Sequence, residues 1–346
     1  MNRFLTFHVT QENESRINIY RSESADDFFR LITQDRESFL IVDTGFKTIW
    51  ADQFGQSDFL KKAYPISGGE RCKSIDRVFE LINSLQNEER RIKRVIAIGG
   101  GSLIDLSGYV CYSSVPDVTF EVVPTTPFSQ LTGFYKRRFY LNYDRKKNRL
   151  SVQGIPGRSL IFPDLLKTFS TNDIRRAHVA AYAVALGYDE RYYHLVKRSL
   201  NEMVHDKIDW DHLAELIWEN NFLQAKASKD LMLVFPGETM ANFIQNATGL
   251  QKDYVAAMST GVRMELFLSN RLGYLDDAAY HLFDEELKKL EDDKRSDYDY
   301  QSFMMNIRKE KSIVLPLVKA LGISERTRIE TVSLEHLIIS FFSQNH

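Results

Sequence analysis

The sequence predicts an α/β protein, with a doubly wound, Rossmann-like parallel sheet in its N-terminal part and an all-helical C-terminal part. Three observations lead to this prediction. A short apolar run at residues 95–98 is followed at once by three glycines. Strand-like and helix-like patterns alternate as far as about residue 165, and beyond that point the apolar spacing is helical only. We therefore expect an α/β domain over residues 1–164 and an α-helical domain over residues 165–346.

The stretch at residues 94–126 is the central element of this prediction. A continuous apolar run at 95–98 is expected of a parallel strand that is covered on both faces. Gly99, Gly100 and Gly101 follow the run, and a helix is expected directly after them. Glycines at a strand's carboxyl end let the backbone approach a ligand, and a helix N-terminus offers N–H groups to an anion. The stretch predicts a phosphate-binding loop, and a tight turn without a ligand is the alternative.

The other N-terminal elements support the parallel sheet. Strand patterns lie at residues 4–9, 39–42 and 118–123. A helix is predicted over residues 74–85 because apolar residues recur there at helical spacing. We expect this helix to pack on the sheet through the following side chains: Ile75, Val78, Phe79, Ile82 and Leu85.

The C-terminal part shows helical spacing in four long segments. They are residues 211–229, 238–248, 253–272 and 275–290. Gly249 and Gly273 stand where C-terminal helix caps are expected. The charged residues 292–299 are expected to form a solvated connection.

Composition and charge exclude several classes of protein. The 346 residues are 43% hydrophobic and 27% charged with a net charge of −2, so no basic excess points to nucleic acid. The two cysteines lack metal-ligand spacing and are too few for a disulfide framework, which indicates a reducing compartment. The first residues lack the apolar core of a signal peptide, and no run approaches the roughly 20 apolar residues of a membrane span. We expect a cytoplasmic protein.

Several segments resemble the dehydroquinate synthase family, the NAD-dependent sugar phosphate cyclases. The resemblance rests on GGERCKSIDRVFELI, GGGSLIDLSG, VPTTPFSQ and FPGETMANFIQNATGL, in that order along the chain. It implies an α/β domain that binds NAD, a helical domain and a possible homodimer. The apolar strand residues Phe120, Val122 and Val123 are then expected near such a dimer interface.

The resemblance implies a set of cofactor-binding residues. Carboxylates accept hydrogen bonds from ribose hydroxyls, backbone N–H groups hold the pyrophosphate, and threonine hydroxyls reach the adenosine end. For the Glu70–Lys73 pair the alternative is a solvated loop pair. The implied residues are Asp43, Glu70, Lys73, Gly99, Gly100, Gly101, Asp105, Thr125 and Thr126.

Of the positions by which the family binds its substrate and its metal, the sequence matches only some. Asn142, Lys147 and Asn148 match substrate-binding positions and would hold a phosphorylated or carboxylated ligand. The family binds a divalent metal through one glutamate and two histidines, and the matching positions here are Ala180, Glu238 and Lys252. Alanine has no ligand atom and an ammonium repels a cation, so we expect no metal of the Zn or Co type at this position.

A metal site rebuilt from other residues is the alternative. His178, Glu238, Asn242 and Asp253 fall on predicted helices or their ends, and such a set would bind zinc or iron weakly. Against this, His178 is expected to be an ordinary surface or helix-end histidine.

Two functions remain open from the sequence, and catalytic residues are not identified. The first is a dehydroquinate synthase-like pseudoenzyme that binds NAD as a structural or sensing ligand. The second is an active NAD-dependent cyclase, lyase or oxidoreductase acting on a phosphorylated or carboxylated polyol. The altered metal positions favour the first, and the retained cofactor residues keep the second open.

Overall fold

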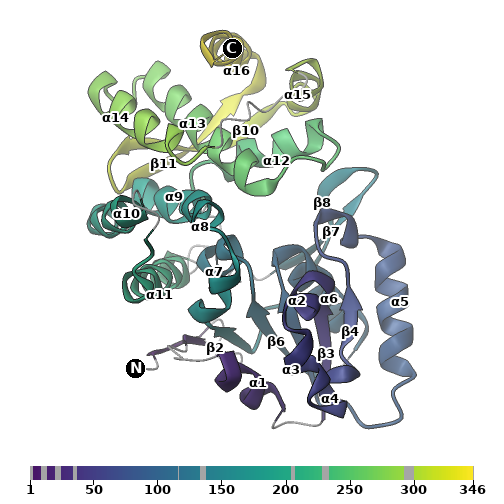
Figure 1. Ribbon diagram of the computed structural model, residues 1–346. Helices are drawn as coiled ribbons and strands as arrows, with labels where there is room; N and C mark the ends of the chain where they lie inside the picture. Colours follow the sequence, from purple (N-terminus) through teal and green to yellow (C-terminus); the bar gives the residue numbers. More distant parts are fainter. Residues whose placement is uncertain are drawn as a thin grey trace. The chain divides into compact units, whose positions relative to one another are not determined.

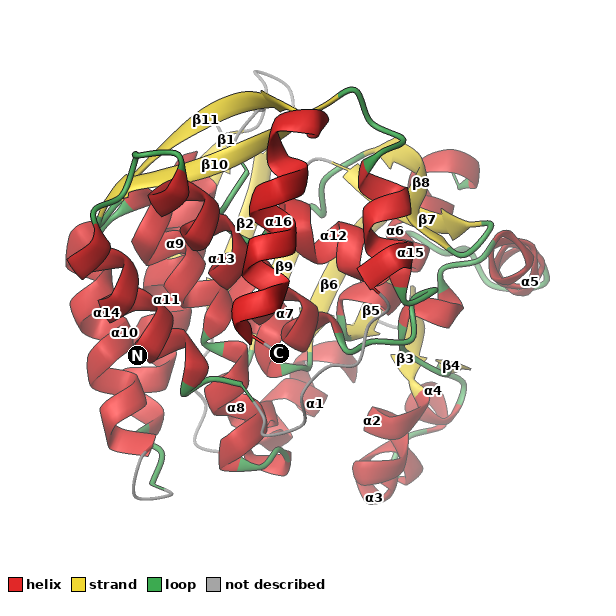
Figure 2. Ribbon diagram, turned by 90° about the horizontal axis from the view of Figure 1, so that it is seen from above, coloured by secondary structure: helices red, strands yellow, loops and turns green. Residues whose placement is uncertain are grey.

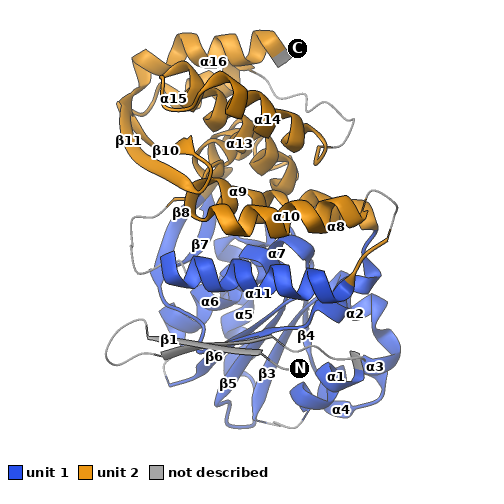
Figure 3. Ribbon diagram, turned by 90° about the vertical axis from the view of Figure 1, so that its left-hand side faces the viewer, with its two compact units in different colours: residues 1–144, 148–170, 210–229 blue, residues 145–147, 171–209, 230–346 orange. Residues whose placement is uncertain are grey.

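The computed structural model describes residues 3–8, 14–19, 25–33, 37–115, 117–132, 138–203, 207–227, 234–291 and 300–345. The chain divides into two compact units, coloured separately in Figure 3. Unit 1 contains residues 1–144, 148–170 and 210–229, and unit 2 contains residues 145–147, 171–209 and 230–346.

A mostly parallel sheet forms the centre of unit 1. Within the described residues its seven strands have the order β1-β2-β9-β6-β5-β3-β4. Figure 1 labels β2, β6, β3 and β4 of this sheet, and Figure 2 labels all of these strands. β1 and β2 pair antiparallel, and each other neighbouring pair is parallel. The predicted α/β fold class is therefore confirmed. The strands are β1 (Arg3–His8), β2 (Glu14–Ile19), β3 (Ser38–Asp43), β4 (Tyr64–Ile66), β5 (Arg94–Gly99), β6 (Thr119–Pro124) and β9 (Arg158–Ile161).

Both faces of the sheet are covered. Since alternate residues of a strand point to opposite faces, one strand contributes side chains to both. Phe39 and Ile41 of β3 belong to an apolar cluster with α5 and α6. Leu40 and Val42 of the same strand belong to a cluster with α1, α2, α3 and α4 on the other face. The further elements of unit 1 are α1 (Ala25–Thr33), α2 (Thr44–Ile49), α3 (Ala51–Gly55), α4 (Asp58–Lys61), η1 (Glu70–Cys72), α5 (Ile75–Gln86), α6 (Gly101–Ser114), α7 (Pro127–Thr132), the hairpin β7 (Arg138–Tyr143) and β8 (Lys146–Gln153), η2 (Pro163–Thr168) and α11 (Trp210–Ala227).

The predicted helix at 74–85 exists, but its buried face differs from the prediction. Ser74 caps α5 by accepting a hydrogen bond from the Arg77 N–H. Phe79 is 60% exposed and Ile75 is 37% exposed, so the prediction that they pack on the sheet is wrong. Val78, Ile82 and Leu85 do pack on the cluster at the sheet, as predicted, and Leu81, which was not predicted, is buried with them.

The expectation for the β6 side chains is also wrong. Phe120, Val122 and Val123 are all at most 2% exposed. β6 lies inside the sheet between β5 and β9, so both of its faces are covered within the chain. These residues are not available for a dimer interface.

Helix α11 belongs to unit 1, so the division into units differs from the expected single boundary after residue 164. Its buried Asn220 and Gln224 side chains both donate to the Leu131 carbonyl of α7. Asn221 donates to the neighbouring Gln130 carbonyl. These buried amide hydrogen bonds join the helix to the segment that follows β6.

Unit 2 is mainly helical, but the prediction of an all-helical C-terminal part is wrong in one respect. β10 (Ser312–Ala320) and β11 (Ile323–Glu330) form an antiparallel hairpin, seen in Figure 2 as the long yellow pair. Ile313, Leu315 and Leu317 of β10 are buried, and the strand packs on α13. The helices of unit 2 are α8 (Thr171–Ala177), α9 (Val179–Tyr188), α10 (Glu190–Met203), α12 (Glu238–Ala247), α13 (Tyr254–Arg271), α14 (Asp277–Lys288), α15 (Tyr300–Ile307) and α16 (Thr331–Asn345).

The predicted helix ends are confirmed at both glycines. Gly249 has φ +57° and Gly273 has φ +77°, the left-handed conformation of a C-terminal cap. Residues 292–299 lie outside the described residues. None of the helices in the described ranges has the length and apolar character needed to cross a membrane.

The crossing of α12 and α13 gives a first test of the fold. A Cβ at Gly261 would lie 2.4 Å from the Gly237 carbonyl oxygen and 2.9 Å from the Ala241 nitrogen. Both obstacles are backbone atoms, so we expect Gly261→Ala to lower the free energy of unfolding by about 3 kcal/mol. Chemical denaturation measures this. Gly55→Ala is the control, because its Cβ would meet no described atom within 4 Å. Equal stability of the two variants would contradict the described crossing.

A buried carboxyl on α13 gives a second test. Glu265 accepts hydrogen bonds from the Gly237 and Met240 N–H groups at the start of α12. Burial raises its pKa from 4.5 to about 8, against the effect of these hydrogen bonds. The folded protein therefore holds this proton more tightly than the unfolded chain, and the stability it contributes is lost as pH rises towards about 8.

We expect denaturation series between pH 5 and pH 8 to show this loss in the parent protein and a reduced slope in Glu265→Gln. Glu285, with 66% of its side chain exposed, provides the matched control Glu285→Gln, which should keep the parent slope. If stability fell with pH in Glu265→Gln as steeply as in the parent protein, the raised pKa would not belong to Glu265.

Candidate functional site

The glycine loop leaves room for a ligand at one of its three glycines. A Cβ at Gly99 would lie 3.1 Å from the Leu103 side chain, and one at Gly100 would lie 3.2 Å from Thr126 Cγ2. A Cβ at Gly101 would meet no atom of the described chain within 4 Å. Gly100 is the N-cap residue of α6 and has no side chain to accept from the first N–H groups of that helix. The loop therefore presents helix N–H groups beside open space, which suits an anion.

Asp43 lies at the same edge of the sheet as this loop. β3 and β5 are parallel neighbours, and Val42 of β3 pairs with Ile98 of β5. Asp43 and Gly99 are the next residues of the two strands. Asp43 Oδ1 accepts a hydrogen bond from the Phe46 N–H at 3.0 Å and thereby caps α2. A Cβ at Gly68 would lie 2.2 Å from Asp43 Oδ2, so only glycine leaves room for this carboxylate. Gly68 was not among the predicted residues, although its place in the pair before Glu70 was a signal.

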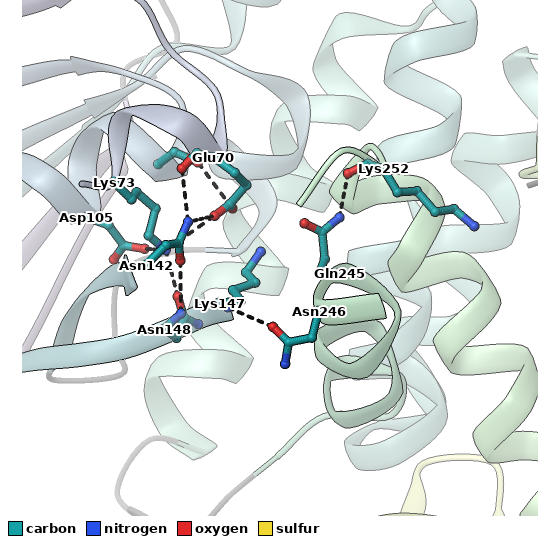
Figure 4. A network of polar contacts seen from close by, with 10 residues as sticks. Glu70, Lys73, Asp105, Asn142, Lys147, Asn148, Gln245, Asn246 and Lys252 are labelled. Carbon is teal, nitrogen blue, oxygen red and sulfur yellow. Dashed lines mark hydrogen bonds and ion pairs between the residues drawn. The ribbon is translucent and has the colours of Figure 1, made fainter. Parts of the chain in front are cut away.

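Lys73 is the centre of a polar network in unit 1 (Figure 4). Its side chain is only 2% exposed, so the alternative of a solvated loop pair is wrong for this residue. Lys73 Nζ lies 2.7 Å from Asp105 Oδ2, 2.7 Å from Asn148 Oδ1 and 3.8 Å from Glu70 Oε2. Burial lowers the pKa of Lys73, but the Asp105 and Glu70 charges outweigh burial and the pKa is raised. Lys73 is a fixed positive charge at neutral pH.

Asn142 joins the same network from β7. Its amide donates to the Glu70 backbone oxygen at 3.0 Å and to Glu70 Oε2 at 2.9 Å. Its oxygen accepts from the Asn148 N–H at 2.9 Å. The other Glu70 carboxylate oxygen accepts from Ser102 Oγ, 3.3 Å away in the first turn of α6. Ser102 was missed by the sequence analysis, although it directly follows the three glycines.

The two threonines of the predicted cofactor set have local structural roles. Thr125 is buried, and its N–H donates to the Gly99 carbonyl at 3.0 Å. Thr126 Oγ1 lies 2.8 Å from Ser129 Oγ, and the Thr126 N–H donates to the same oxygen. Thr126 therefore closes the start of α7 with Ser129.

Lys147 belongs to unit 2, and its contacts with Asn246 and Tyr254 lie within that unit. Its N–H donates to Asn246 Oδ1 at 2.7 Å. Its ammonium lies 3.6 Å from the centre of the Tyr254 ring, at cation–π distance. The neighbouring residue Asn148 has φ +57°, an uncommon backbone conformation for a residue other than glycine.

His178 is fully buried, so its predicted surface position is wrong, although it does lie at a helix end as the N-cap residue of α9. Its Nδ1 lies 2.8 Å from the Ile174 carbonyl and its Nε2 lies 2.9 Å from Ser199 Oγ. Burial lowers its pKa to about 4, against the effect of the Ile174 hydrogen bond. The ring is therefore neutral and joins α8, α9 and α10.

The remaining candidate ligands lie around α12 and the start of α13. Glu238 opens α12, and Asn242 Oδ1 is buried without a hydrogen-bond partner in the described part of the chain. Asp253 caps α13 and lies 2.6 Å from Arg176 NH2, which neutralises it. Burial lowers the pKa of Lys252 to about 8, although the Glu291 and Asp253 charges oppose this.

The matching position on α9 carries no ligand atom. Ala180 is 4% exposed and offers only a methyl group. Figure 4 shows that the Lys252 ammonium points away from Gln245, whose amide donates to the Lys252 carbonyl at 2.5 Å.

Comparison with known proteins agrees with this fold. The family model "3-dehydroquinate synthase N-terminal" matches residues 63–176. The 3-dehydroquinate synthase of Clostridium tetani is 25% identical over 322 residues, which cover 88% of this chain and 85% of that protein.

Two solved structures are similar over nearly the whole chain. A 2-epi-5-epi-valiolone synthase from Streptomyces hygroscopicus subsp. jinggangensis, with NAD+ and Zn2+ bound, has a TM-score of 0.81 at 16% identity and covers 98% of this chain and 99% of its own. A 2-deoxy-scyllo-inosose synthase complexed with carbaglucose-6-phosphate, NAD+ and Co2+ has a TM-score of 0.77 at 15% identity, with the same coverage of 98% and 99%. The chain is therefore similar to 3-dehydroquinate synthases in sequence and to these two solved structures in fold.

Proposed function

We propose that this protein binds NAD in unit 1 and does not carry out the metal-dependent cyclase reaction of its family. The observation that carries the proposal is the start of α6, where open space at Gly101 lies beside helix N–H groups. A pyrophosphate is the anion that suits such a helix end in a parallel α/β sheet.

The flanking residues support a dinucleotide over a lone phosphate. Asp43 stands one strand away from the loop, where a carboxylate accepts hydrogen bonds from a ribose. The same carboxylate disfavours the 2′-phosphate of NADP by charge repulsion. Glu70 and Lys73, which follow β4 beside β3, form the polar network that reaches Ser102 in the first turn of α6. Glu70, Lys73 and Asn148 would then lie towards the nicotinamide end.

The residues at the family's metal position do not fit a zinc or cobalt ion. A structural or catalytic zinc needs at least three protein ligands, and Glu238 is the only carboxylate among the three matching residues. Ala180 has no ligand atom, and Lys252 adds a positive charge. His178 would have to break a buried hydrogen bond before it coordinated a metal.

A second function is favoured by the preserved hairpin between β7 and β8. Asn148 of this hairpin is held by hydrogen bonds to Lys73 and Asn142, as a ligand-binding residue would need. In this reading the protein is an NAD-dependent cyclase, lyase or oxidoreductase on a phosphorylated or carboxylated polyol. Oxidation of such a polyol would show as NADH absorbance in single turnover, and its absence across a panel of polyol phosphates would favour the non-catalytic function.

Substitution at Gly101 tests the cofactor proposal. We expect calorimetry to show saturable binding of NAD by the parent protein. A Cβ at this position would meet no atom of the described chain within 4 Å, so in Gly101→Val we expect the fold to persist while NAD affinity falls at least about tenfold, or 1.4 kcal/mol. Gly55→Ala is again the control and should bind as the parent does. Unchanged affinity in Gly101→Val would exclude the loop as the binding site.

Metal content tests the chemical part of the proposal. We expect protein purified without chelator to contain substoichiometric divalent metal, and to be inactive on the linear phosphorylated substrate of dehydroquinate synthases with NAD and added zinc. The combined variant Ala180→Glu, Glu238→His and Lys252→His restores the family's ligand types and should gain one bound zinc. A full equivalent of metal in the parent, or turnover that chelation abolishes, would contradict the proposal.

A further inference from the structure

We infer that Asn142 is a positioning residue, which holds the Glu70 carboxylate and the Asn148 backbone in place for the ligand and does not contact the ligand itself. This inference rests on the proposed binding of a dinucleotide in unit 1. It replaces the expectation that Asn142 binds substrate directly.

The hydrogen-bonding capacity of the Asn142 amide is used inside the protein. A side-chain amide has two N–H donors, and both Glu70 oxygens that they reach lie within 3.0 Å. The amide oxygen accepts from the Asn148 N–H at 2.9 Å. The orientation of the amide is fixed by its neighbours, because a flipped amide would turn its oxygen towards the Glu70 oxygens and its N–H groups towards another N–H. Asn142 therefore has no donor left for a ligand.

Asn148 depends on this amide for its backbone conformation. Its φ of +57° lies in the left-handed region, which is unfavourable for a residue other than glycine. The Asn142 oxygen satisfies the Asn148 N–H in that conformation and so helps to stabilise it. Asn148 Oδ1 then accepts from Lys73 Nζ at 2.7 Å. Among the described residues the Asn148 amide nitrogen has no hydrogen-bond partner, so it is the group that remains for a ligand.

Glu70 depends on the same amide for its direction. Asn142 binds one oxygen of the carboxylate, and the other oxygen meets Ser102 at the start of α6. The backbone N–H of Asn142 donates to the Lys73 carbonyl at 2.8 Å, so the loop over residues 70–73 is held at both ends. Figure 4 shows Asn142 between Glu70 and Asn148, with Lys73 and Asp105 behind it. One amide thus fixes a ligand-facing carboxylate and a ligand-facing asparagine.

Substitution by aspartate separates a positioning role from a merely structural one. Asn142→Asp keeps an acceptor for the Asn148 N–H but places a second carboxylate against Glu70. The two carboxylates repel at high pH, and a proton shared between them at low pH restores the lost hydrogen bond. Asn142→Ala loses every side-chain hydrogen bond of Asn142 at all pH values. Asn83→Asp, an exposed substitution on α5, is the matched control.

Calorimetry with NAD near pH 8 and near pH 5 is the experiment. Relative to the parent at the same pH, we expect the affinity of Asn142→Asp to be at least about tenfold weaker near pH 8 and to recover near pH 5. Asn142→Ala should stay weak at both pH values, and Asn83→Asp should match the parent. Parent-like affinity in Asn142→Ala, or an affinity ratio for Asn142→Asp that does not change with pH, would overturn the inference.

Amide exchange of the ligand-free protein gives a readout that does not involve NAD. The Asn148 N–H should be protected in the parent and in Asn142→Asp, and should lose protection in Asn142→Ala. Failure of the parent to bind NAD would refute the proposed function but leave this exchange pattern to decide whether Asn142 holds Asn148. Equal protection in all three proteins would overturn the inference.

Discussion

The parallel register of β3, β5 and β6 is the constraint on which the site in unit 1 depends. Val42 pairs with Ile98, and Gly99 pairs with Pro124, so three strands end at one edge of the sheet. Their following residues are Asp43, Gly100 and Thr125. A slip by one residue would move the side chains of each apolar cluster to the opposite face of the sheet and break both clusters, so the core fixes this arrangement. The acidic and glycine positions are neighbours as a consequence of packing.

The buried Lys73 ammonium connects this edge to the β7–β8 hairpin. A buried charge that loses its partner costs about 3–5 kcal/mol, so Asp105, Glu70 and Asn148 are constrained by stability as well as by ligand binding. The raised pKa makes Lys73 an unsuitable general base at neutral pH. The network therefore prepares a polar surface of fixed charge, which suits recognition of a cofactor.

The sequence predicted the parallel sheet and the glycine loop because both depend on local patterns. The apolar run at 95–98 and the caps at Gly249 and Gly273 are read from neighbouring residues. The exposure of Phe79 depends on how α5 is rotated against α6, which the spacing of apolar residues did not determine. The β10–β11 hairpin was missed because only β10 is buried, and its partner β11 is mostly polar. The hydrogen bonds between Asn142 and Glu70 join residues 72 positions apart, so sequence spacing did not indicate them.

We propose a dinucleotide site in unit 1 and no zinc or cobalt site at Ala180, Glu238 and Lys252 in unit 2. Ala180 offers no ligand atom at that position. A crystal structure of protein grown with NAD and zinc, with anomalous data at the zinc edge, tests both parts directly. The account predicts a pyrophosphate over Gly101 and no anomalous peak beside Glu238. A zinc ion ligated by side chains of unit 2, or a dinucleotide bound away from Gly101, would contradict it.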